Sequence, residues 1–196
     1  IVKIDYLVED SYIIHLRSPI ELPEIKAGNF AEIQIPGAPD VFLRRPFSIL
    51  DVDYKKRLIS FYIKAIGKGS AHLGKLNAGD NVNIIYPLGN KYNVPKSAKK
   101  VLIVGGGSGI APFILLGKQL QKQNVEVTFL IGGRSKKDIL LTDEFAKYGE
   151  VTATTEDGSF GEKGLVTQHS IFNDEGFPFD KVFTCGPDAM MKAVGK

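Results

Sequence analysis

Apolar and polar residues alternate along the first half of the chain in short runs, the pattern of strands with one buried face. Turn-forming residues separate these runs, as at 27–29 and 36–39. Short strands joined by such turns predict an antiparallel β-barrel. We expect its strands at residues 1–8, 12–16, 30–35, 47–52, 58–66 and 81–86, with one short helix at 70–76.

The pattern changes in the second half, where apolar runs alternate with longer stretches of helical period. This alternation predicts an α/β domain with a parallel sheet and crossover helices. A short polar and basic segment at 95–100 separates the halves, so we place the domains at 1–96 and 97–196. The expected strands are 101–104, 125–131, 151–154 and 181–184, and the expected helices are 111–123, 141–148 and 188–194.

Composition narrows the choice of protein class. The 196 residues carry a formal net charge of +3, which is too small to argue for nucleic-acid binding. No apolar run approaches the roughly 18 to 20 residues that span a bilayer. The sequence shows no secretory signal, and its single cysteine, Cys185, favours a reducing compartment. We therefore expect a cytoplasmic protein with no nucleic-acid or membrane partner. No metal site is expected in this chain, because its three histidines are scattered.

A glycine-rich turn follows the apolar strand Val101–Val104. Its residues are Gly105-Gly106-Gly107-Ser108-Gly109, and a helical stretch with Pro112 in its first turn comes next. Glycines let the backbone approach a ligand, and the free amides of a helix start favour phosphate. The alternative is a tight strand–helix connection that binds nothing.

The barrel half contains a second candidate motif, Arg45-Pro46-Phe47-Ser48. An arginine can pair with a diphosphate, an aromatic ring can stack on a flat cofactor, and a serine hydroxyl can bond a ring nitrogen. The alternative is an arginine pair on a solvated strand edge. Further on, Gly67, Gly69 and Ser70 suggest another phosphate-binding helix start, or a plain hairpin exit with Ser70 near the N-cap.

Two further features lie in the second half. Arg134, Lys136 and Lys137 form a basic cluster that could bind a 2′-phosphate and select NADP, although we favour a solvated loop. Cys185-Gly186-Pro187 follows an apolar strand. A lone cysteine is more often a small buried apolar residue than a functional one.

Together these motifs resemble the ferredoxin-NADP reductase superfamily, in the same order and over essentially the whole chain. The resemblance narrows at segments 44–49, 87–90, 155–164 and 185–194. These look like the electron-transfer subunit of bacterial two-subunit, NAD-dependent dihydroorotate dehydrogenase. In that family the barrel binds FAD and the α/β domain binds NAD.

The resemblance implies roles for individual residues. The flavin would be held by Arg45, Pro46, Phe47 and Ser48, flanked by Tyr62, Ile63 and Lys64, with its diphosphate at Gly67, Gly69 and Ser70. NAD would be held by Gly105, Gly106, Gly107, Ser108, Gly109, Arg134, Cys185, Gly186 and Pro187. Ser48 and Cys185 would lie next to the path of the hydride, and Cys185 would not be a nucleophile.

The implied function is that of a flavin-dependent NAD(P)H oxidoreductase. It would exchange hydride with NAD(H) and relay electrons to or from a dihydroorotate dehydrogenase catalytic subunit in pyrimidine biosynthesis. Two alternatives stay open: a free-standing NAD(P)H-dependent ferredoxin or flavodoxin reductase, and a non-catalytic flavin-binding regulatory module. The choice between NAD and NADP also stays open.

The sequence departs from the family pattern in two places. The family normally carries a cysteine-rich C-terminal segment with a [2Fe-2S] cluster, which needs four ligands. Cys185 alone cannot hold one, so we expect a cluster only in a longer form, or else a homologue that works without it. Phe47 stands where many superfamily members have tyrosine, which retains ring stacking and removes a phenol hydrogen bond.

Overall fold

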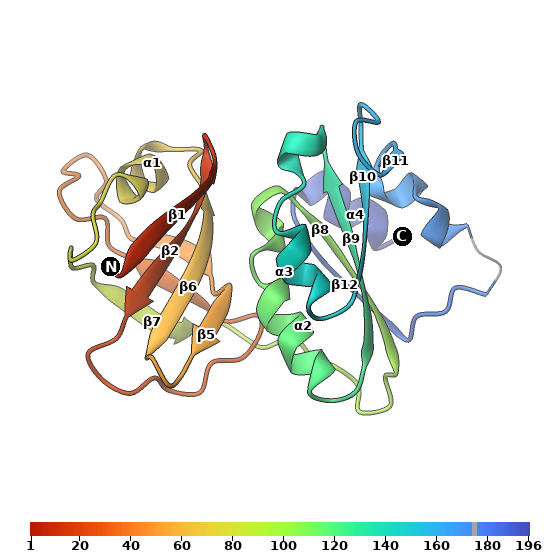
Figure 1. The fold of residues 1–196 in the computed structure, drawn as a ribbon, viewed down its shortest axis with the longest axis horizontal. Helices are drawn as coiled ribbons and strands as arrows, with labels where there is room; N and C mark the ends of the chain where they lie inside the picture. The colour runs from red at the N-terminus through yellow and green to blue at the C-terminus, as the bar shows by residue number, and fades with distance from the viewer. Residues whose placement is uncertain (174–175) are drawn as a thin grey trace. The chain divides into compact units, whose positions relative to one another are not determined.

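The computed structural model describes residues 1–173 and 176–196. They form two compact units, Ile1–Tyr92 and Asn93–Lys196 (Figure 1). The second unit therefore begins a few residues before the position expected from the polar segment at 95–100.

The first unit is built from antiparallel strands in two sheets, with strand orders β1-β2-β6-β5 and β4-β3-β7. Alternate side chains of β2 and β6 point inward, so that Ile14, Leu16, Ile59 and Phe61 are buried. The elements are β1 (Lys3–Val8), β2 (Ser11–Arg17), β3 (Phe30–Ile33), β4 (Arg45–Ser48), β5 (Asp51–Asp53), β6 (Leu58–Lys64), α1 (Lys68–Gly74) and β7 (Ile84–Leu88).

The single strand expected at 47–52 is wrong, because this stretch forms β4 and β5 in different sheets. Two consecutive side chains between them, Ile49 and Leu50, are both buried, which breaks the alternation of a single strand. The Ile49 amide donates to the Asn29 carbonyl, next to β3, while the Leu50 amide donates to the Ser60 carbonyl on β6. The chain therefore passes from one sheet to the other at this point.

The second unit is built on a parallel sheet with strand order β11-β10-β9-β8-β12. Its strands are β8 (Lys100–Gly106), β9 (Glu126–Gly133), β10 (Glu150–Thr155), β11 (Glu162–Lys163) and β12 (Lys181–Cys185). Its helices are α2 (Phe113–Gln121), α3 (Thr142–Ala146) and α4 (Asp188–Val194), with 3₁₀ turns η1 (Gly107–Ile110), η2 (Lys136–Asp138), η3 (Val166–Gln168) and η4 (Ser170–Phe172).

Helices cover both faces of this sheet (Figure 1). On one face, the ring of Phe145 in α3 packs on Phe129 of β9, with ring centroids 4.9 Å apart, and α2 packs beside them. On the other face, η3, η4 and α4 surround a buried cluster of Leu102, Leu130 and Val166. Both faces are apolar because a parallel sheet of this kind is buried on both sides.

The strand order contains a topological switch point, which is the place where the direction of the chain across the sheet reverses. The chain runs from β8 outward through β9, β10 and β11, and then returns to β12 on the other side of β8. The connections that leave β8 and β12 therefore diverge. In open α/β sheets, ligands bind at the carboxyl ends of the two strands where this divergence occurs.

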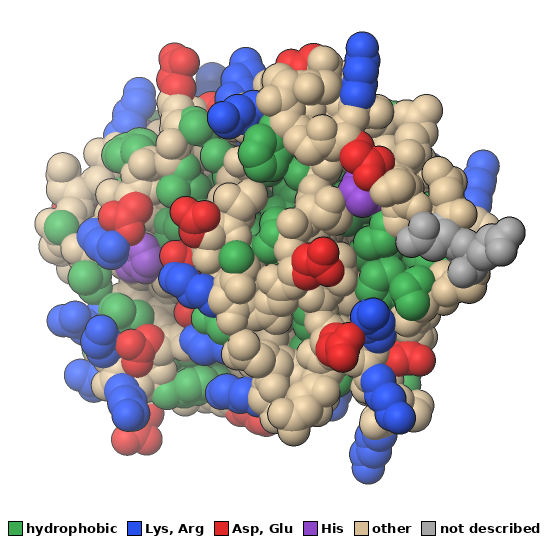
Figure 2. Space-filling model, turned by 45° about the vertical axis from the view of Figure 1, so that its right-hand side comes forward, with side chains coloured by type: hydrophobic (Ala, Val, Ile, Leu, Met, Phe, Trp, Pro, Cys, Tyr) green, Lys and Arg blue, Asp and Glu red, His purple; other side chains and the backbone are tan. Residues whose placement is uncertain are grey.

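The surface carries both signs of charge. On the face drawn in Figure 2, Lys and Arg side chains are interspersed with Asp and Glu, in keeping with the small net charge. Within residues 1–173 and 176–196, no helix has the length and apolar character needed to cross a lipid bilayer.

Candidate functional site

The first part of the candidate site lies where β4 meets the start of α1. Arg45 opens β4, which is an edge strand paired with β3. A β-carbon placed on Gly69 would lie 3.1 Å from Val41 Cγ1 and 3.5 Å from Arg45 Cγ. Two of the motifs expected from the sequence, Arg45–Ser48 and the segment that begins at Gly67, are thus brought into contact by the fold.

The two neighbouring arginines have different partners. Arg44 donates from Nη1 to the Asn83 carbonyl at 2.9 Å and from Nη2 to Asn83 Oδ1 at 2.6 Å. Arg45 donates to backbone, to the carbonyls of Leu43 at 2.9 Å and Arg44 at 3.2 Å. Among the described residues, no carboxylate forms an ion pair with Arg45. The guanidinium of Arg44 is thus held by the Asn83 side chain, whereas that of Arg45 is bonded to local backbone carbonyls.

Ser70 caps the start of α1. Its Oγ accepts a hydrogen bond from the Gly67 amide at 3.2 Å and donates to the Gly67 carbonyl at 3.1 Å. The alternative interpretation of this segment, a hairpin exit with Ser70 near the N-cap of the helix, therefore agrees with these hydrogen bonds. A β-carbon on Gly67 would meet nothing within 4 Å, which leaves open space in front of this turn. The space and the neighbouring Arg45 fit a phosphate group, and the role of Gly67, Gly69 and Ser70 in holding a diphosphate stays a prediction.

The segment Tyr62–Lys64 offers little side chain to a ligand. The side chains of Tyr62 and Ile63 are buried, and Tyr62 lies within 3.5 Å of Ser11 Oγ. Lys64 Nζ lies 3.5 Å from Asp10 Oδ2. Any contact of Tyr62 and Ile63 with a flavin is thus confined to backbone atoms. On β4, by contrast, Pro46 is exposed, and Phe47 and Ser48 are half-buried.

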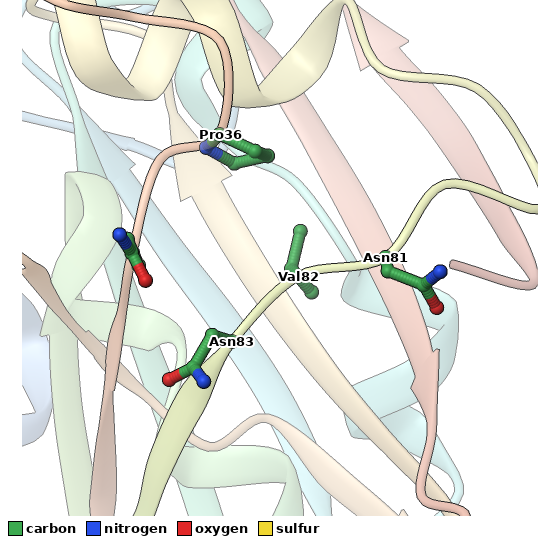
Figure 3. A pocket seen from close by; sticks show the side chains of 5 residues that line it. Pro36, Asn81, Val82 and Asn83 are labelled. Atoms are coloured by element: carbon green, nitrogen blue, oxygen red, sulfur yellow. The ribbon is translucent and has the colours of Figure 1, made fainter.

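A pocket of about 380 Å³ lies elsewhere in the first unit. It is lined by Gln34, Pro36, Asn81, Val82 and Asn83, whose side chains are drawn in Figure 3. The Gln34 amide donates to the Asn83 carbonyl at 2.9 Å, which joins its two walls. None of the residues predicted from the sequence to bind a cofactor lines this pocket.

The second part of the candidate site is the glycine-rich turn at the carboxyl end of β8. The strand continues through Gly105 and Gly106, and the turn itself is the 3₁₀ turn η1. The helix expected from residue 111 begins at Phe113, with Pro112 as its N-cap. Gly107 has φ +56°, and a β-carbon there would meet nothing within 4 Å. The turn thus presents open backbone to a ligand at Gly107, as a nucleotide diphosphate requires.

The other glycines of this turn serve packing. A β-carbon on Gly105 would lie 2.9 Å from Ile110 Cγ2, and one on Gly106 would lie 2.8 Å from Met190 Sδ. One on Gly109 would lie 2.3 Å from the Cys185 carbonyl oxygen. The glycine run is therefore explained in large part by close approach of the turn to β12 and α4.

Cys185 and its neighbours lie at the same edge of the sheet. Cys185 pairs in register with Gly105, and Gly186 approaches the backbone of Gly106. The fold thus brings the Gly105–Gly109 turn and the Cys185–Pro187 turn together at the switch point between β8 and β12. Burial raises the pKa of the Cys185 thiol, so that it is neutral near pH 7. This protonation state agrees with a role that is not nucleophilic.

Arg134 lies further along this edge, directly after β9. It is exposed, and its carbonyl accepts a hydrogen bond from the Asp157 amide at 3.1 Å. Asp157 in turn accepts from the Ser159 amide and hydroxyl, which lowers the pKa of its carboxyl group. The turn that holds Asp157 belongs to segment 155–164, which is one of the segments that carry the family resemblance. By that resemblance Thr155, Glu156 and Asp157 would lie near the flavin and the nucleotide, and the alternative is a simple turn.

The donor set of this chain does not fit an iron–sulfur cluster. Cys185 is the single cysteine of the sequence and supplies one thiolate. Within the described part of the chain, no group of three or more His, Cys, Asp or Glu is placed to hold a metal ion. No electron-transfer step through a cluster follows from these residues.

The antiparallel unit, the parallel sheet and its glycine turn define an oxidoreductase of the ferredoxin-NADP reductase superfamily. Residues 103–196 match the family model of the oxidoreductase NAD-binding domain. The solved structure of an NADH-dependent reduced ferredoxin-NADP oxidoreductase is 30% identical, with a TM-score of 0.85 over 98% of this chain and 68% of that one.

The sequence relatives identify the family more narrowly. The chain is 32% identical over 192 residues to the dihydroorotate dehydrogenase B (NAD(+)), electron transfer subunit, of Fusobacterium nucleatum subsp. nucleatum. This match covers 96% of the chain and 74% of that protein. The protein of the same name from Shouchella clausii is 32% identical over 196 residues, with 99% and 75% covered. The chain belongs to this family of electron transfer subunits.

These comparisons confirm the family, the two-part fold and the class of flavin-dependent NAD(P)H oxidoreductase predicted from the sequence. They do not address the roles of single residues, which stay predictions.

Proposed function

We propose that this chain is an FAD-containing electron-transfer subunit that exchanges a hydride with NAD(H). It relays electrons to or from a dihydroorotate dehydrogenase catalytic subunit, in pyrimidine biosynthesis and in the cytoplasm. The observation that carries the proposal is the meeting of the Gly105–Gly109 and Cys185–Pro187 turns at the switch point of the sheet. It occurs in a chain about one third identical to named electron transfer subunits.

In the first unit, the residues of β4 bind and orient FAD. Arg45 neutralises the diphosphate, because its guanidinium has no carboxylate partner among the described residues and lies beside the open turn at Gly67. Pro46 and Phe47 contact the ring system, with Phe47 supplying an aromatic face. Ser48 offers a hydroxyl that can donate to or accept from the ring edge, and so sets its orientation.

In the second unit, the backbone amides of the η1 turn bind the diphosphate of NAD(H). Gly107 admits it, because its positive φ and the open space around it leave the amides uncovered. Cys185 presents a neutral, uncharged side chain at the edge where the nicotinamide is expected. A neutral thiol leaves the ring without a competing charge and without an attacking nucleophile.

FAD would supply the chemistry when bound, since it can accept two electrons together as a hydride and release them singly. The protein supplies position, exclusion of water and electrostatics. The choice of NAD over NADP follows the family, and the exposed Arg134 beside Asp157 is the place where a 2′-substituent would be recognised.

Rapid mixing of FAD-loaded protein with NADH under anaerobic conditions tests the first half of the proposal. We expect the absorbance band of oxidised flavin to bleach in a phase that saturates with NADH. A flavin band that stays unchanged would exclude an electron-transfer enzyme and leave a non-catalytic flavin-binding module.

Co-purification with a dihydroorotate dehydrogenase catalytic subunit tests the second half. We expect a stable complex in which dihydroorotate bleaches the flavin of this chain. A free-standing ferredoxin or flavodoxin reductase is the second candidate, because the ferredoxin-NADP oxidoreductase structure is also 30% identical. It predicts no such complex and rapid reduction of added ferredoxin or flavodoxin by NADH.

A further inference from the structure

The side chain of Met190 reaches the place where the Gly105–Gly109 and Cys185–Pro187 turns of the second unit meet. A β-carbon built on Gly106 would lie 2.8 Å from Met190 Sδ, and one built on Gly186 would lie 2.7 Å from Met190 Cε. These two atoms are bonded to each other, so the end of one side chain lies against both turns. The contact is made from α4 and not from either turn.

The local structure of α4 explains how Met190 reaches both turns. The helix begins at Asp188 with Pro187 as its N-cap, and the Met191 amide donates to the Pro187 carbonyl at 3.0 Å. Met190 therefore lies in the first turn of the helix. Helical side chains lean toward the N-terminus of their helix, which here is the end that joins the Cys185–Pro187 turn. An unbranched thioether bends to fill an irregular space of this kind.

Met190 also connects the two turns to the core of the sheet. It is half-buried and packs against the buried cluster that η3, η4 and α4 surround. The turns themselves touch through backbone, since a β-carbon on Gly186 would also lie 3.0 Å from the Gly106 carbonyl oxygen. Glycine backbone offers no side chain that would interlock the turns, and Met190 supplies one from the core.

We propose that Met190 is a positioning residue for the nicotinamide nucleotide, because it fixes the separation of the two turns. The inference rests on the proposed function, in which Gly107 admits the diphosphate and Cys185 lies at the nicotinamide edge. A dinucleotide held at both turns loses its fit when their separation changes, whereas a ligand held at one turn does not. Met190 acts through Gly106 and Gly186 and is not itself a catalytic residue.

Two ligands separate a positioning role from a general effect on packing. Binding of NAD⁺ and of ADP-ribose, which lacks the nicotinamide, is measured by isothermal titration calorimetry on FAD-loaded protein. We expect the wild-type protein to bind NAD⁺ more tightly than ADP-ribose. Met190→Ala should weaken NAD⁺ binding about tenfold and leave ADP-ribose binding unchanged. Met190→Leu, which retains an apolar side chain of similar volume, should restore most of the NAD⁺ affinity.

Val194→Ala is the matched control. Val194 lies one turn further along α4 and packs against the same buried cluster, but it is not among the atoms nearest to a β-carbon on Gly106 or Gly186. This variant should lower the thermal unfolding midpoint and leave both affinities unchanged. Equal loss of the two ligands in Met190→Ala, or an equal loss of NAD⁺ affinity in Val194→Ala, would make Met190 a general packing residue and overturn the proposal. Equal affinity of wild-type protein for the two ligands would overturn it as well.

These outcomes differ from failure of the proposed function. If NADH does not bleach bound flavin, the proposed electron transfer fails, while the affinities of the Met190 variants still decide the positioning role. If wild-type protein binds neither NAD⁺ nor ADP-ribose, both proposals fail. The positioning role alone fails when Met190→Ala binds NAD⁺ and is reduced by NADH as the wild-type protein is.

Discussion

Gly109 lies so close to the end of β12 that a β-carbon on it would stand 2.3 Å from the carbonyl oxygen of Cys185. The neighbouring backbone atoms of Cys185 and Gly186 would be only 2.5 Å away. A real β-carbon essentially never lies within 3.0 Å of a non-bonded heavy atom, and the obstacle here is backbone, which cannot rotate away as a side chain can. Because Gly109 has no β-carbon, the turn that follows β8 can pack directly against the turn that follows β12.

Gly109→Ala should destabilise the second unit, since the backbone of either turn must shift to admit the methyl group. Overpacking of this kind costs about 1 to 3 kcal/mol, and we expect the upper end of that range. Urea denaturation followed by circular dichroism measures the change in the free energy of unfolding. Gly195→Ala, where the nearest atom would be 3.4 Å from the new carbon, is the control and should change little. Equal stability of the two variants would contradict the close approach.

Arg45→Ala should weaken retention of FAD. A charge-assisted hydrogen bond to phosphate contributes roughly 1.5 to 3 kcal/mol, so the dissociation constant should rise by about ten- to a hundredfold. The measurement is the ratio of flavin to protein after gel filtration. Arg44→Ala is the matched control, because Arg44 already uses its guanidinium on Asn83. Unchanged flavin content in Arg45→Ala would count against the assigned role of this residue.

Cys185→Ala should slow hydride transfer while the fold stays intact. Cys185 is only partly exposed at the edge where the nicotinamide is expected, and a smaller side chain would let the ring move away from its productive position. We expect roughly a tenfold lower rate of flavin reduction by NADH, with an unaltered thermal unfolding midpoint. Cys185→Ser should retain most of the rate. The same rate in the wild-type and Ala proteins would remove Cys185 from the hydride path.

The stability of the protein should fall as the pH is lowered below about 6.5. Burial, aided by the nearby Lys3 charge, lowers the pKa of His15 from this usual value, although Asp5 acts in the opposite direction. The unfolded imidazole therefore takes up a proton more readily than the folded one. The stabilisation is fully present above the unfolded pKa and is lost as the pH falls through the folded pKa.

Urea denaturation at a series of pH values between 7 and 5 tests this expectation. His15→Gln should show a smaller decrease in the free energy of unfolding over that interval than the wild-type protein. Asp5 does not interfere, because its own pKa is lowered from 3.8 and lies outside the interval. Parallel curves for the two proteins would show that His15 does not titrate as proposed.

Most strands and helices could be read from the sequence because their apolar spacing is local. The helix expected at 188–194 is α4, and the strand expected at 181–184 is β12 with one further residue. The strand at 47–52 was misjudged because the passage between two sheets leaves no local sign beyond two adjacent apolar residues. The two-residue strand β11 was not expected, since so short a strand has no period to detect.

For the candidate site too, some features could be predicted from the sequence and others could not. The motifs at 45–48, 67–70, 105–109 and 185–187 could be found in the sequence, and their order indicated the family. The sequence could not separate the glycines of the 105–109 turn that open onto a ligand from those that admit a neighbouring strand. It also gave no sign that the end of Met190 lies against both Gly106 and Gly186, because this contact depends on how α4 packs on the sheet.

The sequence by itself therefore determined the two-part architecture, the family and the segments that can meet a phosphate or a flat ring. These follow from periodicity and from the chemistry of residue types, which act over a few neighbours. Only the tertiary structure decided that Asn83 holds the guanidinium of Arg44 and not that of Arg45, and that Gly109 lies against Cys185. Such facts depend on pairs of residues far apart in the chain, whose distance is set by packing and not by their spacing.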